Sequence, residues 1–117
     1  MPIDYDYYID YFENKNQFYT IQPDFLHHYD PFIYSETIKK LIRELQENNI
    51  LIPLVDINLK NYSKFINSKH FDNANLSDIK NIMTVIFKDG IHTPAYLATI
   101  IDRGYLLKIL RKLKEIT

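Results

Sequence analysis

Apolar residues recur at helical spacing in several short segments of this chain, and this pattern most limits the fold that it can adopt. In residues 77–88 and again in residues 105–115, apolar side chains follow the i, i+3, i+4, i+7 pattern. That spacing places them on one face of an α-helix. We predict helices near residues 3–13, 35–48, 57–68, 77–88, 94–102 and 105–115, and no sheet of three or more strands.

Capping residues stand at the boundaries of the predicted helices. Short polar side chains before a helix accept hydrogen bonds from its first backbone N–H groups, and glycine adopts the left-handed conformation that ends many helices. Gly104 is therefore expected to separate the last two helices. We expect N-caps at Ser35, at Asp56 or Asn58, at Ser77, and at Thr93 before Pro94.

Two segments lack a helical period. Residues 16–34 hold two prolines among isolated aromatic side chains, which predicts a long packed loop with a short strand or turn near residues 19–21. Residues 50–55 form an apolar run that Pro53 interrupts. Because proline rarely occupies a central strand, we interpret this run as a buried connector.

The length of 117 residues is typical of one domain. The absence of cysteine excludes disulfides and thiolate zinc sites and suits a reducing cytoplasm. No apolar stretch approaches the roughly 18 residues of a membrane span. We therefore predict a mostly α, compact single-domain bundle of five or six helices in the cytoplasm, with the acidic, Tyr-rich residues 1–34 packed on a helical core of residues 35–117.

Charge is distributed unevenly along the chain. Residues 1–36 carry seven carboxylates and one lysine, a local charge of −6, so the remaining residues carry +5. Seven of the ten tyrosines also lie in residues 1–36. An acidic, aromatic N-terminal segment thus precedes a mildly basic helical part.

The run DYDYYIDYF at residues 4–12 is the first candidate binding surface. On a helix, Tyr5, Tyr8 and Phe12 share one inward face with Ile9, whereas Tyr7 and Tyr11 lie one turn apart on another. Exposed tyrosines beside carboxylates are typical of protein-binding surfaces. Alternatively, Tyr7 and Tyr11 pack under the loop from Phe18 to Tyr34. The predicted partner-binding residues are Asp4, Asp6, Tyr7, Asp10 and Tyr11.

The last helix is the second candidate surface, for nucleic acid. The segment TPAYLATIIDRG at residues 93–104 has the length of a helix in a helix-turn-helix motif, with Tyr96 and Thr99 as its outward side chains. The helix after it carries a stripe of bases that would neutralise phosphates. The residues of this alternative are Lys108, Arg111 and Lys112.

Metal and catalytic sites find little support in the sequence. His27 and His28, with Asp24 and Asp30 nearby, have the composition of a metal site, but adjacent side chains in extended chain point in opposite directions. His70 and His92 suggest nothing more specific. We therefore predict no metal, no cofactor and no catalytic residue.

Three segments carry a family resemblance: YSETIKKLIREL at residues 34–45, FDNANLSDIKNIM at residues 71–83 and AYLATIIDRGYLLKILRKLKEI at residues 95–116. With the closing Gly-x-Leu-Leu-Lys-x-Leu-x-x-Leu-Lys helix, residues 33–117 resemble an uncharacterised domain family of bacterial and phage proteins. Members of that family carry an Arg-x-Asp/Glu-Arg-Phe-x-x-Gly signature where this chain has KDGIHTPA at residues 88–95, so only Lys88 keeps the basic character. The resemblance implies the fold more than a function.

These observations favour a non-enzymatic protein-binding module. We expect a phage or mobile-element protein that inhibits a host protein with a basic surface through its acidic, Tyr-rich N-terminal surface. The alternative is a helix-turn-helix-like regulator that binds nucleic acid. A membrane partner is not expected, and a homo-oligomer is left open.

Overall fold

The computed structural model describes residues 2–14, 17–21, 32–88 and 95–117. These residues form a mostly helical single-domain bundle, as the sequence predicted, with one two-stranded sheet. None of the helices in these ranges is long and apolar enough to cross a membrane. The elements are α1 (Tyr5–Asn14), β1 (Tyr19–Ile21), β2 (Phe32–Tyr34), α2 (Glu36–Glu47), the 3₁₀ turn η2 (Leu54–Asp56), α3 (Leu59–Ser68), α4 (Leu76–Phe87), α5 (Tyr96–Asp102) and α6 (Tyr105–Ile116).

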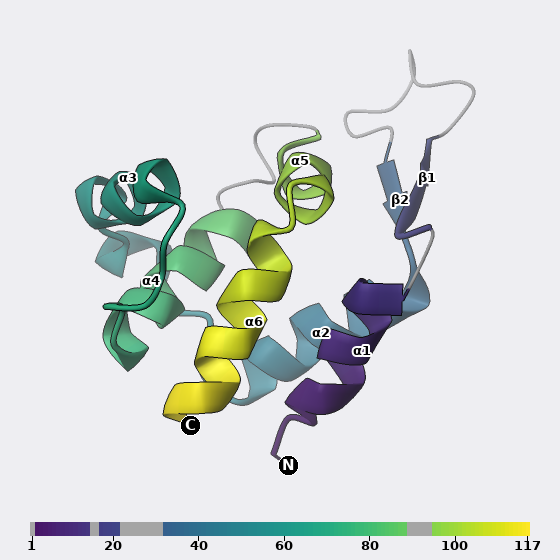
Figure 1. The fold of residues 1–117 in the computed structure, drawn as a ribbon, viewed down its shortest axis with the longest axis horizontal. Helices are drawn as coiled ribbons and strands as arrows, with labels where there is room; N and C mark the ends of the chain where they lie inside the picture. Colours follow the sequence, from purple (N-terminus) through teal and green to yellow (C-terminus); the bar gives the residue numbers. More distant parts are fainter. Residues whose placement is uncertain (1, 15–16, 22–31, 89–94) are drawn as a thin grey trace.

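Helix α6 lies at the centre of the arrangement (Figure 1). It contacts α1 on one side and α4 and α5 on the other, while α3 packs against α4. The sheet of β1 and β2 projects from the end of the bundle where α1 and α2 lie (Figure 1). The chain thus places its first and last helices side by side.

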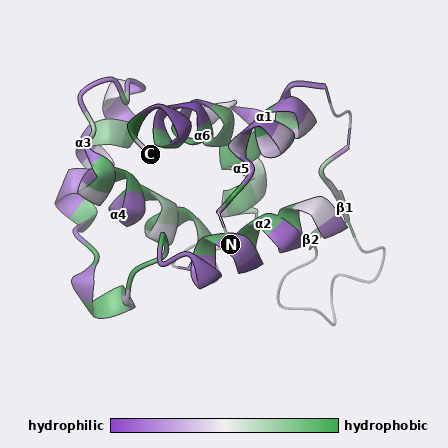
Figure 2. Ribbon diagram, turned by 90° about the horizontal axis from the view of Figure 1, so that it is seen from below, coloured by the Kyte–Doolittle hydropathy of each residue, from purple (hydrophilic) through white to green (hydrophobic). Residues whose placement is uncertain are grey.

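The core lies between the apolar faces of α2, α4 and α6. Figure 2 shows hydrophobic residues of these helices facing the interior. Large aliphatic side chains at helical spacing are fully buried there, which confirms the periodicity predicted for these segments. They are Ile38, Leu41 and Leu45 of α2, Ile79, Ile82, Met83 and Ile86 of α4, and Leu106, Ile109, Leu110 and Leu113 of α6.

Three of the predicted helix boundaries are confirmed by their caps. Ser35 Oγ accepts a hydrogen bond from the N–H of Ile38 at 3.3 Å, at the start of α2. Asn58 Oδ1 accepts one from the N–H of Asn61 at 2.9 Å, at the start of α3. Gly104 has φ +77° between α5 and α6, in the left-handed region that glycine adopts at little cost.

The cap predicted for α4 was wrong. Asn75, not Ser77, begins this helix: its Oδ1 accepts from the N–H of Asp78 at 2.8 Å, and Asp78 Oδ2 accepts from the N–H of Asn75 at 3.0 Å. This reciprocal capping box satisfies two backbone donors at once, so it fixes the start two residues earlier than a serine cap would. The cap predicted at Thr93 lies outside the described residues.

The interpretation of residues 50–55 as a buried connector was only partly right. Ile50 and Leu51 are buried, but Leu54 and Val55 are exposed, Val55 to 90%. The N–H of Ile52 donates to Thr84 Oγ1 at 2.8 Å, which ties the run to α4 only up to that residue. After Pro53 the chain turns outward in η2. Leu59, the first residue of α3, is exposed as well.

The loop predicted over residues 16–34 is described only at its two ends, which form the sheet. β1 and β2 are antiparallel, with Thr20 opposite Ile33. The strand expected near residues 19–21 is therefore present. Tyr19 Oη donates a hydrogen bond to Asp102 Oδ2 at 2.8 Å, which joins the sheet to α5, and this bond raises the pKa of Tyr19.

Tyr8 joins α1 to α2 within the core. Its side chain is 1% exposed, and its Oη donates a hydrogen bond to a carboxylate oxygen of Glu44. Burial and this neighbouring carboxylate both disfavour the phenolate, so the pKa of Tyr8 is raised well above its ordinary value of 10.0. Tyr8 therefore stays protonated in the folded protein at pH values where it ionises in the unfolded chain.

Alkaline pH is accordingly expected to destabilise the protein through Tyr8. The contribution is fully present below the ordinary tyrosine pKa of 10.0, at which half of the unfolded tyrosine is ionised, and is lost as the pH rises through the raised pKa of the folded protein. Urea unfolding between pH 8 and pH 11 should show a steeper fall in the unfolding free energy for the native chain than for Tyr8→Phe. Parallel curves for the two proteins would contradict this assignment.

Candidate functional site

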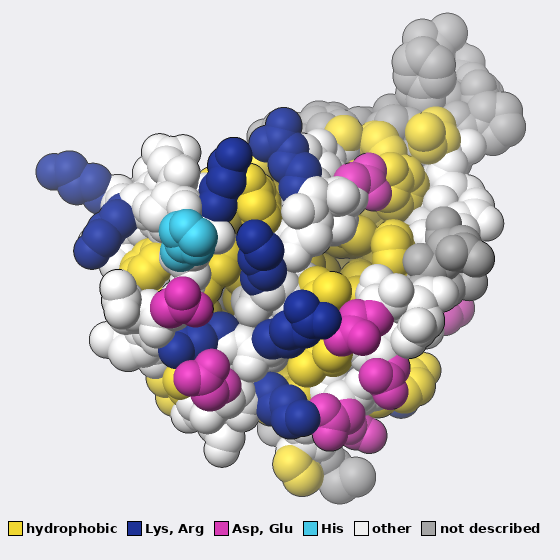
Figure 3. All heavy atoms as spheres, viewed as in Figure 1, with side chains coloured by type: hydrophobic (Ala, Val, Ile, Leu, Met, Phe, Trp, Pro, Cys, Tyr) yellow, Lys and Arg dark blue, Asp and Glu magenta, His cyan; other side chains and the backbone are white. Residues whose placement is uncertain are grey.

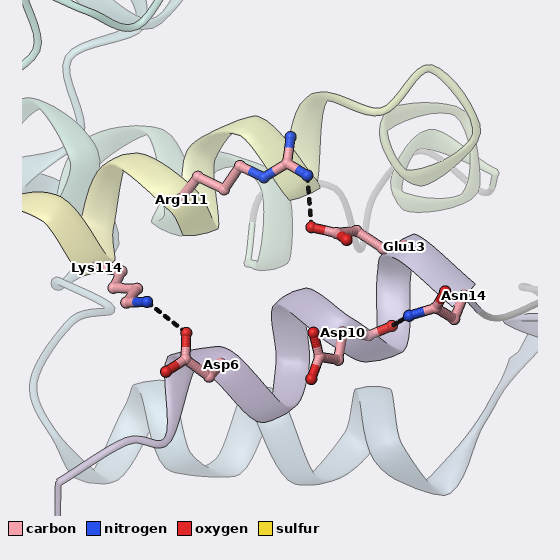
Figure 4. Close-up of polar contacts among 6 residues, drawn as sticks. All are labelled: Asp6, Asp10, Glu13, Asn14, Arg111 and Lys114. Carbon is pink, nitrogen blue, oxygen red and sulfur yellow. Dashed lines mark hydrogen bonds and ion pairs between the residues drawn. The ribbon is translucent and has the colours of Figure 1, made fainter.

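The acidic face of α1 lies against the basic face of α6 (Figure 4). Lys114 Nζ lies 2.5 Å from Asp6 Oδ1, and Arg111 Nη2 lies 2.5 Å from Glu13 Oε1. Asp10 occupies the turn of α1 between these two contacts (Figure 4). The two surfaces that the sequence assigned to different partners therefore contact each other.

Both ion pairs are open to solvent, so their effect is mainly on the surface charge. The side chains of Arg111, Lys114 and Asp6 are all more than half exposed. The hydrogen bond between Lys114 and Asp6 raises the pKa of Lys114 and keeps that side chain positively charged. Exposed pairs of this kind contribute little to stability because water screens them. They do, however, neutralise two of the carboxylates on α1.

Tyr7 and Tyr11 lie in different environments. The Tyr7 side chain is 47% exposed, with its ring edge against Tyr8 at 5.1 Å between centroids and Lys40 Nζ 5.1 Å from its own centroid. Tyr11 is half-buried, and its Oη lies 2.5 Å from Ser35 Oγ. Only Tyr7 thus occupies the exposed ridge predicted for both residues.

The partial burial of Tyr11 follows from an aromatic cluster at the end of α1. Its ring packs edge-on against Phe12 at 5.2 Å and against Phe18 at 5.6 Å. This agrees with the alternative that the loop covers Tyr11. Tyr5 and Phe12, expected to be buried, are only partly so, because they lie at the edge of the core.

Asp4 and Asp10 remain beside Tyr7. Asp4 Oδ1 accepts a hydrogen bond from the N–H of Tyr7 at 3.2 Å, so this carboxylate caps α1. Both Asp4 and Asp10 are exposed, and neither takes part in an ion pair within the described ranges. The three residues follow each other at i, i+3 spacing along α1, and we call them the Tyr7 surface.

The basic residues predicted on α6 line a hollow of about 290 Å³. Lys108 is exposed, whereas the side chain of Lys112 is only 13% exposed, with its Nζ 2.8 Å from the carbonyl oxygen of Asp72. Figure 3 shows Lys and Arg side chains spread over this face from α3 to α6, with Asp and Glu side chains both toward α1 and beside the histidine on the α3 side. We call this space the α6 hollow; it is lined by Lys69, His70, Phe71, Asp72, Lys108, Arg111, Lys112 and Glu115.

A second hollow, of about 620 Å³, adjoins the α6 hollow. The two share His70 and Asp72, which lie in the segment after α3. No site was predicted from the sequence of that segment, HFDNAN at residues 70–75. The sequence signal for a site there is the group of polar residues in this segment, which holds a histidine, an aspartate and two asparagines. The other lining residues are Asn61, Lys64, Phe65, Ser68, Asn73 and Asp78.

Helix α5, the recognition helix of the helix-turn-helix alternative, is packed into the bundle. Ala98, Ile100 and Ile101 are buried. Tyr96 and Thr99, its predicted outward residues, are half-buried: the Tyr96 hydroxyl is hydrogen-bonded to that of Tyr62, and Thr99 Oγ1 donates to the carbonyl oxygen of Ala95. This helix therefore presents few free polar groups to a DNA groove.

The histidine and aspartate residues that were weighed as a metal site lie outside the described residues. This holds for His27 and His28, for Asp24 and Asp30, and for His92. Within the described residues no group of three or more His, Asp or Glu is placed to hold a metal ion. Lys88, the residue kept from the expected signature, donates to the carbonyl oxygen of Ile52 at 3.2 Å.

Residues 7–117 match the model of a family of unknown function, DUF6508. The searches of curated proteins and of solved structures each found no match. Because the match covers nearly the whole chain, the chain belongs to this family, and the resemblance to an uncharacterised domain family is confirmed.

Proposed function

We propose that this DUF6508 protein is a non-enzymatic protein-binding module that contacts a partner with a basic surface through the Tyr7 surface. The observation that carries the proposal is the 47% exposure of Tyr7 on a helix that is otherwise anchored in the core by Tyr8 and Ile9. A large aromatic ring open to solvent on a rigid element is a typical anchor at protein interfaces.

The position of the Tyr7 ring lowers the entropic cost of binding. Its edge contact with Tyr8 and the nearby ammonium of Lys40 already restrict it. A partner then gains contact area without ordering a free side chain. Asp4 and Asp10 flank the ring as exposed carboxylates, so complementary charge favours a Lys- or Arg-rich partner surface. Asp6 is now assigned to the contact with Lys114, and Tyr11 to the aromatic cluster.

Replacing Tyr7 by Ala is expected to weaken binding of the partner by about 2 kcal/mol, the size of a hot-spot truncation. The unfolding free energy should change little, since the ring is outside the core. To test this, proteins are captured on the immobilised native chain, and the one that binds stoichiometrically is purified. Its affinity for the native chain and for Tyr7→Ala is then measured by calorimetry. Its association with the native chain should slow as salt rises, because Asp4 and Asp10 steer a basic surface.

Val55→Ala is the matched control, because it also shortens an exposed apolar side chain, but in η2. Equal binding of the partner by the native chain and Tyr7→Ala would overturn the proposal. A partner whose binding is weakened by Val55→Ala instead would place the interface at η2. The phage or mobile-element origin and the inhibition of a host protein stay predictions from the sequence.

The second candidate function is nucleic-acid binding through α6. It is favoured by the position of Lys108, Arg111 and Lys112 around one hollow rather than by a recognition helix. Phosphate contacts of such side chains give binding that falls steeply with salt. Retention of the native chain on immobilised duplex DNA at low salt, and its loss in a variant with these three residues changed to Glu, tests this alternative.

A further inference from the structure

We propose that the α6 hollow binds the phosphate group of a small phosphorylated compound of nucleotide size. The proposal concerns a different face of the molecule from the Tyr7 surface and does not depend on it. Four cations line the hollow of about 290 Å³ against two carboxylates, and one of the four, Arg111, is also paired with Glu13 of α1. Concentrated positive charge in a concave site attracts anions more strongly than the same charge on an open face. The cations are Lys69, Lys108, Arg111 and Lys112, and the carboxylates are Asp72 and Glu115.

Lys112 is the most firmly held of these cations. Its side chain is largely covered, and its ammonium donates to the carbonyl oxygen of Asp72 at 2.8 Å and to Glu115 Oε1 at 3.5 Å. An ammonium has three donors, and these two contacts use two of them. The side chain of Glu115 is itself 71% exposed, and it is free to turn away when an anion arrives. The structure thus provides a firmly held positive charge whose contact with the carboxylate of Glu115 is long, at 3.5 Å.

Lys69 lies across the hollow from α6 in an unusual backbone conformation. It ends α3 with φ +62° and ψ +14°, in the left-handed region. Glycine or asparagine fits that position with less strain than lysine does. Non-glycine residues in the left-handed conformation occur at binding sites, where the side chain contacts a ligand. Here Lys69, at the turn that follows α3, lines the hollow together with residues of α6.

The second hollow supplies space for the rest of the compound. It continues from the first through His70 and Asp72, and Asn61, Ser68 and Asn73 line it with hydrogen-bonding side chains. Its volume of about 620 Å³ is in the range of sites for small molecules. A compound with a phosphate at one end and a polar body such as a nucleoside at the other fits the two hollows together.

The surroundings favour a small compound over a nucleic-acid strand. A strand needs an extended row of free cations along its backbone. On the α1 side of α6, however, Arg111 and Lys114 are already paired with Glu13 and Asp6. Carboxylates of α1 therefore bound the basic region at this edge and interrupt a row of free cations along α6.

The test titrates the full chain with inorganic pyrophosphate and with ADP by calorimetry, and with a single-stranded oligonucleotide in parallel. We expect one pyrophosphate and one ADP per chain, with each competing for the other. The variant Lys69→Asn with Lys108→Gln should weaken both by about tenfold or more, because charge-assisted hydrogen bonds to phosphate are lost. Asparagine tolerates the left-handed conformation at residue 69. Lys108→Gln alone should weaken both to a smaller extent.

Lys39→Gln with Lys40→Gln is the matched control, since it removes the same charge from α2 and neither residue lines the hollow. Retained binding in this control and weakened binding in the hollow variants supports the proposal. Absence of binding by the native chain, or equal weakening in the control, overturns it. An oligonucleotide that binds more tightly with length and is not displaced by pyrophosphate also overturns it, in favour of a nucleic-acid strand.

Discussion

Replacing Leu110 by Ala is expected to lower the unfolding free energy by about 2 to 5 kcal/mol, the range for large-to-small changes at buried sites. Leu110 is 0% exposed in the middle of α6, where that helix packs against α4 and α5. The change removes apolar contacts and leaves a cavity between helices that cannot close without shifting one another. Urea denaturation followed by circular dichroism measures the loss.

Val55→Ala provides the comparison for this core substitution. It also removes methyl groups, but from a side chain that is 90% exposed in η2. The unfolding free energy should therefore change by less than about 0.5 kcal/mol, as is usual at the surface. A loss of that small size for Leu110→Ala as well would mean that α6 is peripheral to the fold, against the central place that it has in the structure.

The helices were predictable from the sequence because their signals are local. Apolar periodicity in residues 77–88 and 105–115 reflects burial on one face, and the caps at Ser35 and Asn58 bond within their own first turn. Even the error at α4 was local: Asn75 and Ser77 are both good caps, and the carboxylate of Asp78 decides between them by closing the capping box.

Exposure at the 50–59 segment was not predictable because it depends on contacts between distant residues. An apolar run around a proline is compatible with burial, and nothing in the run itself shows that Thr84 anchors the chain only up to Ile52. Beyond that point Leu54, Val55 and Leu59 extend into solvent. The apolar sequence of this segment therefore did not show which of its side chains are buried.

The sequence suggested candidate residues for two surfaces, but it did not show the contacts between the two helices that carry them. The sequence identified the acids of α1 and the bases of α6, more than ninety residues apart, as two separate surfaces. Packing of α1 on α6 brings Asp6 to Lys114 and Glu13 to Arg111. Pairing across such a separation needs the tertiary structure, and it reduces the acidic surface to Asp4 and Asp10 around Tyr7.

Replacing Asn81 by Ala is expected to cost about 3 kcal/mol of unfolding free energy, about 1 kcal/mol for each of three hydrogen bonds lost. Asn81 is a buried polar residue of α4 that joins this helix to the start of α3. Its Oδ1 accepts from the N–H of Asn58 at 2.7 Å, and its Nδ2 donates to the carbonyl oxygen of Asn58 at 2.9 Å and to Asn61 Oδ1 at 3.3 Å.

Asn61→Ala distinguishes the bonds that Asn81 makes to the Asn58 backbone from the side-chain bonds of Asn61. That change removes the side-chain bonds of Asn61 to Asn81 and Asp78 but leaves both backbone groups of Asn58 paired with Asn81. Asn61→Ala should lower the unfolding free energy by about 1 kcal/mol, since water can reach the half-buried side chains of Asn61 and Asp78 and replace the lost bonds. Equal losses for the two variants in urea denaturation would mean that the bonds to the Asn58 backbone contribute nothing specific.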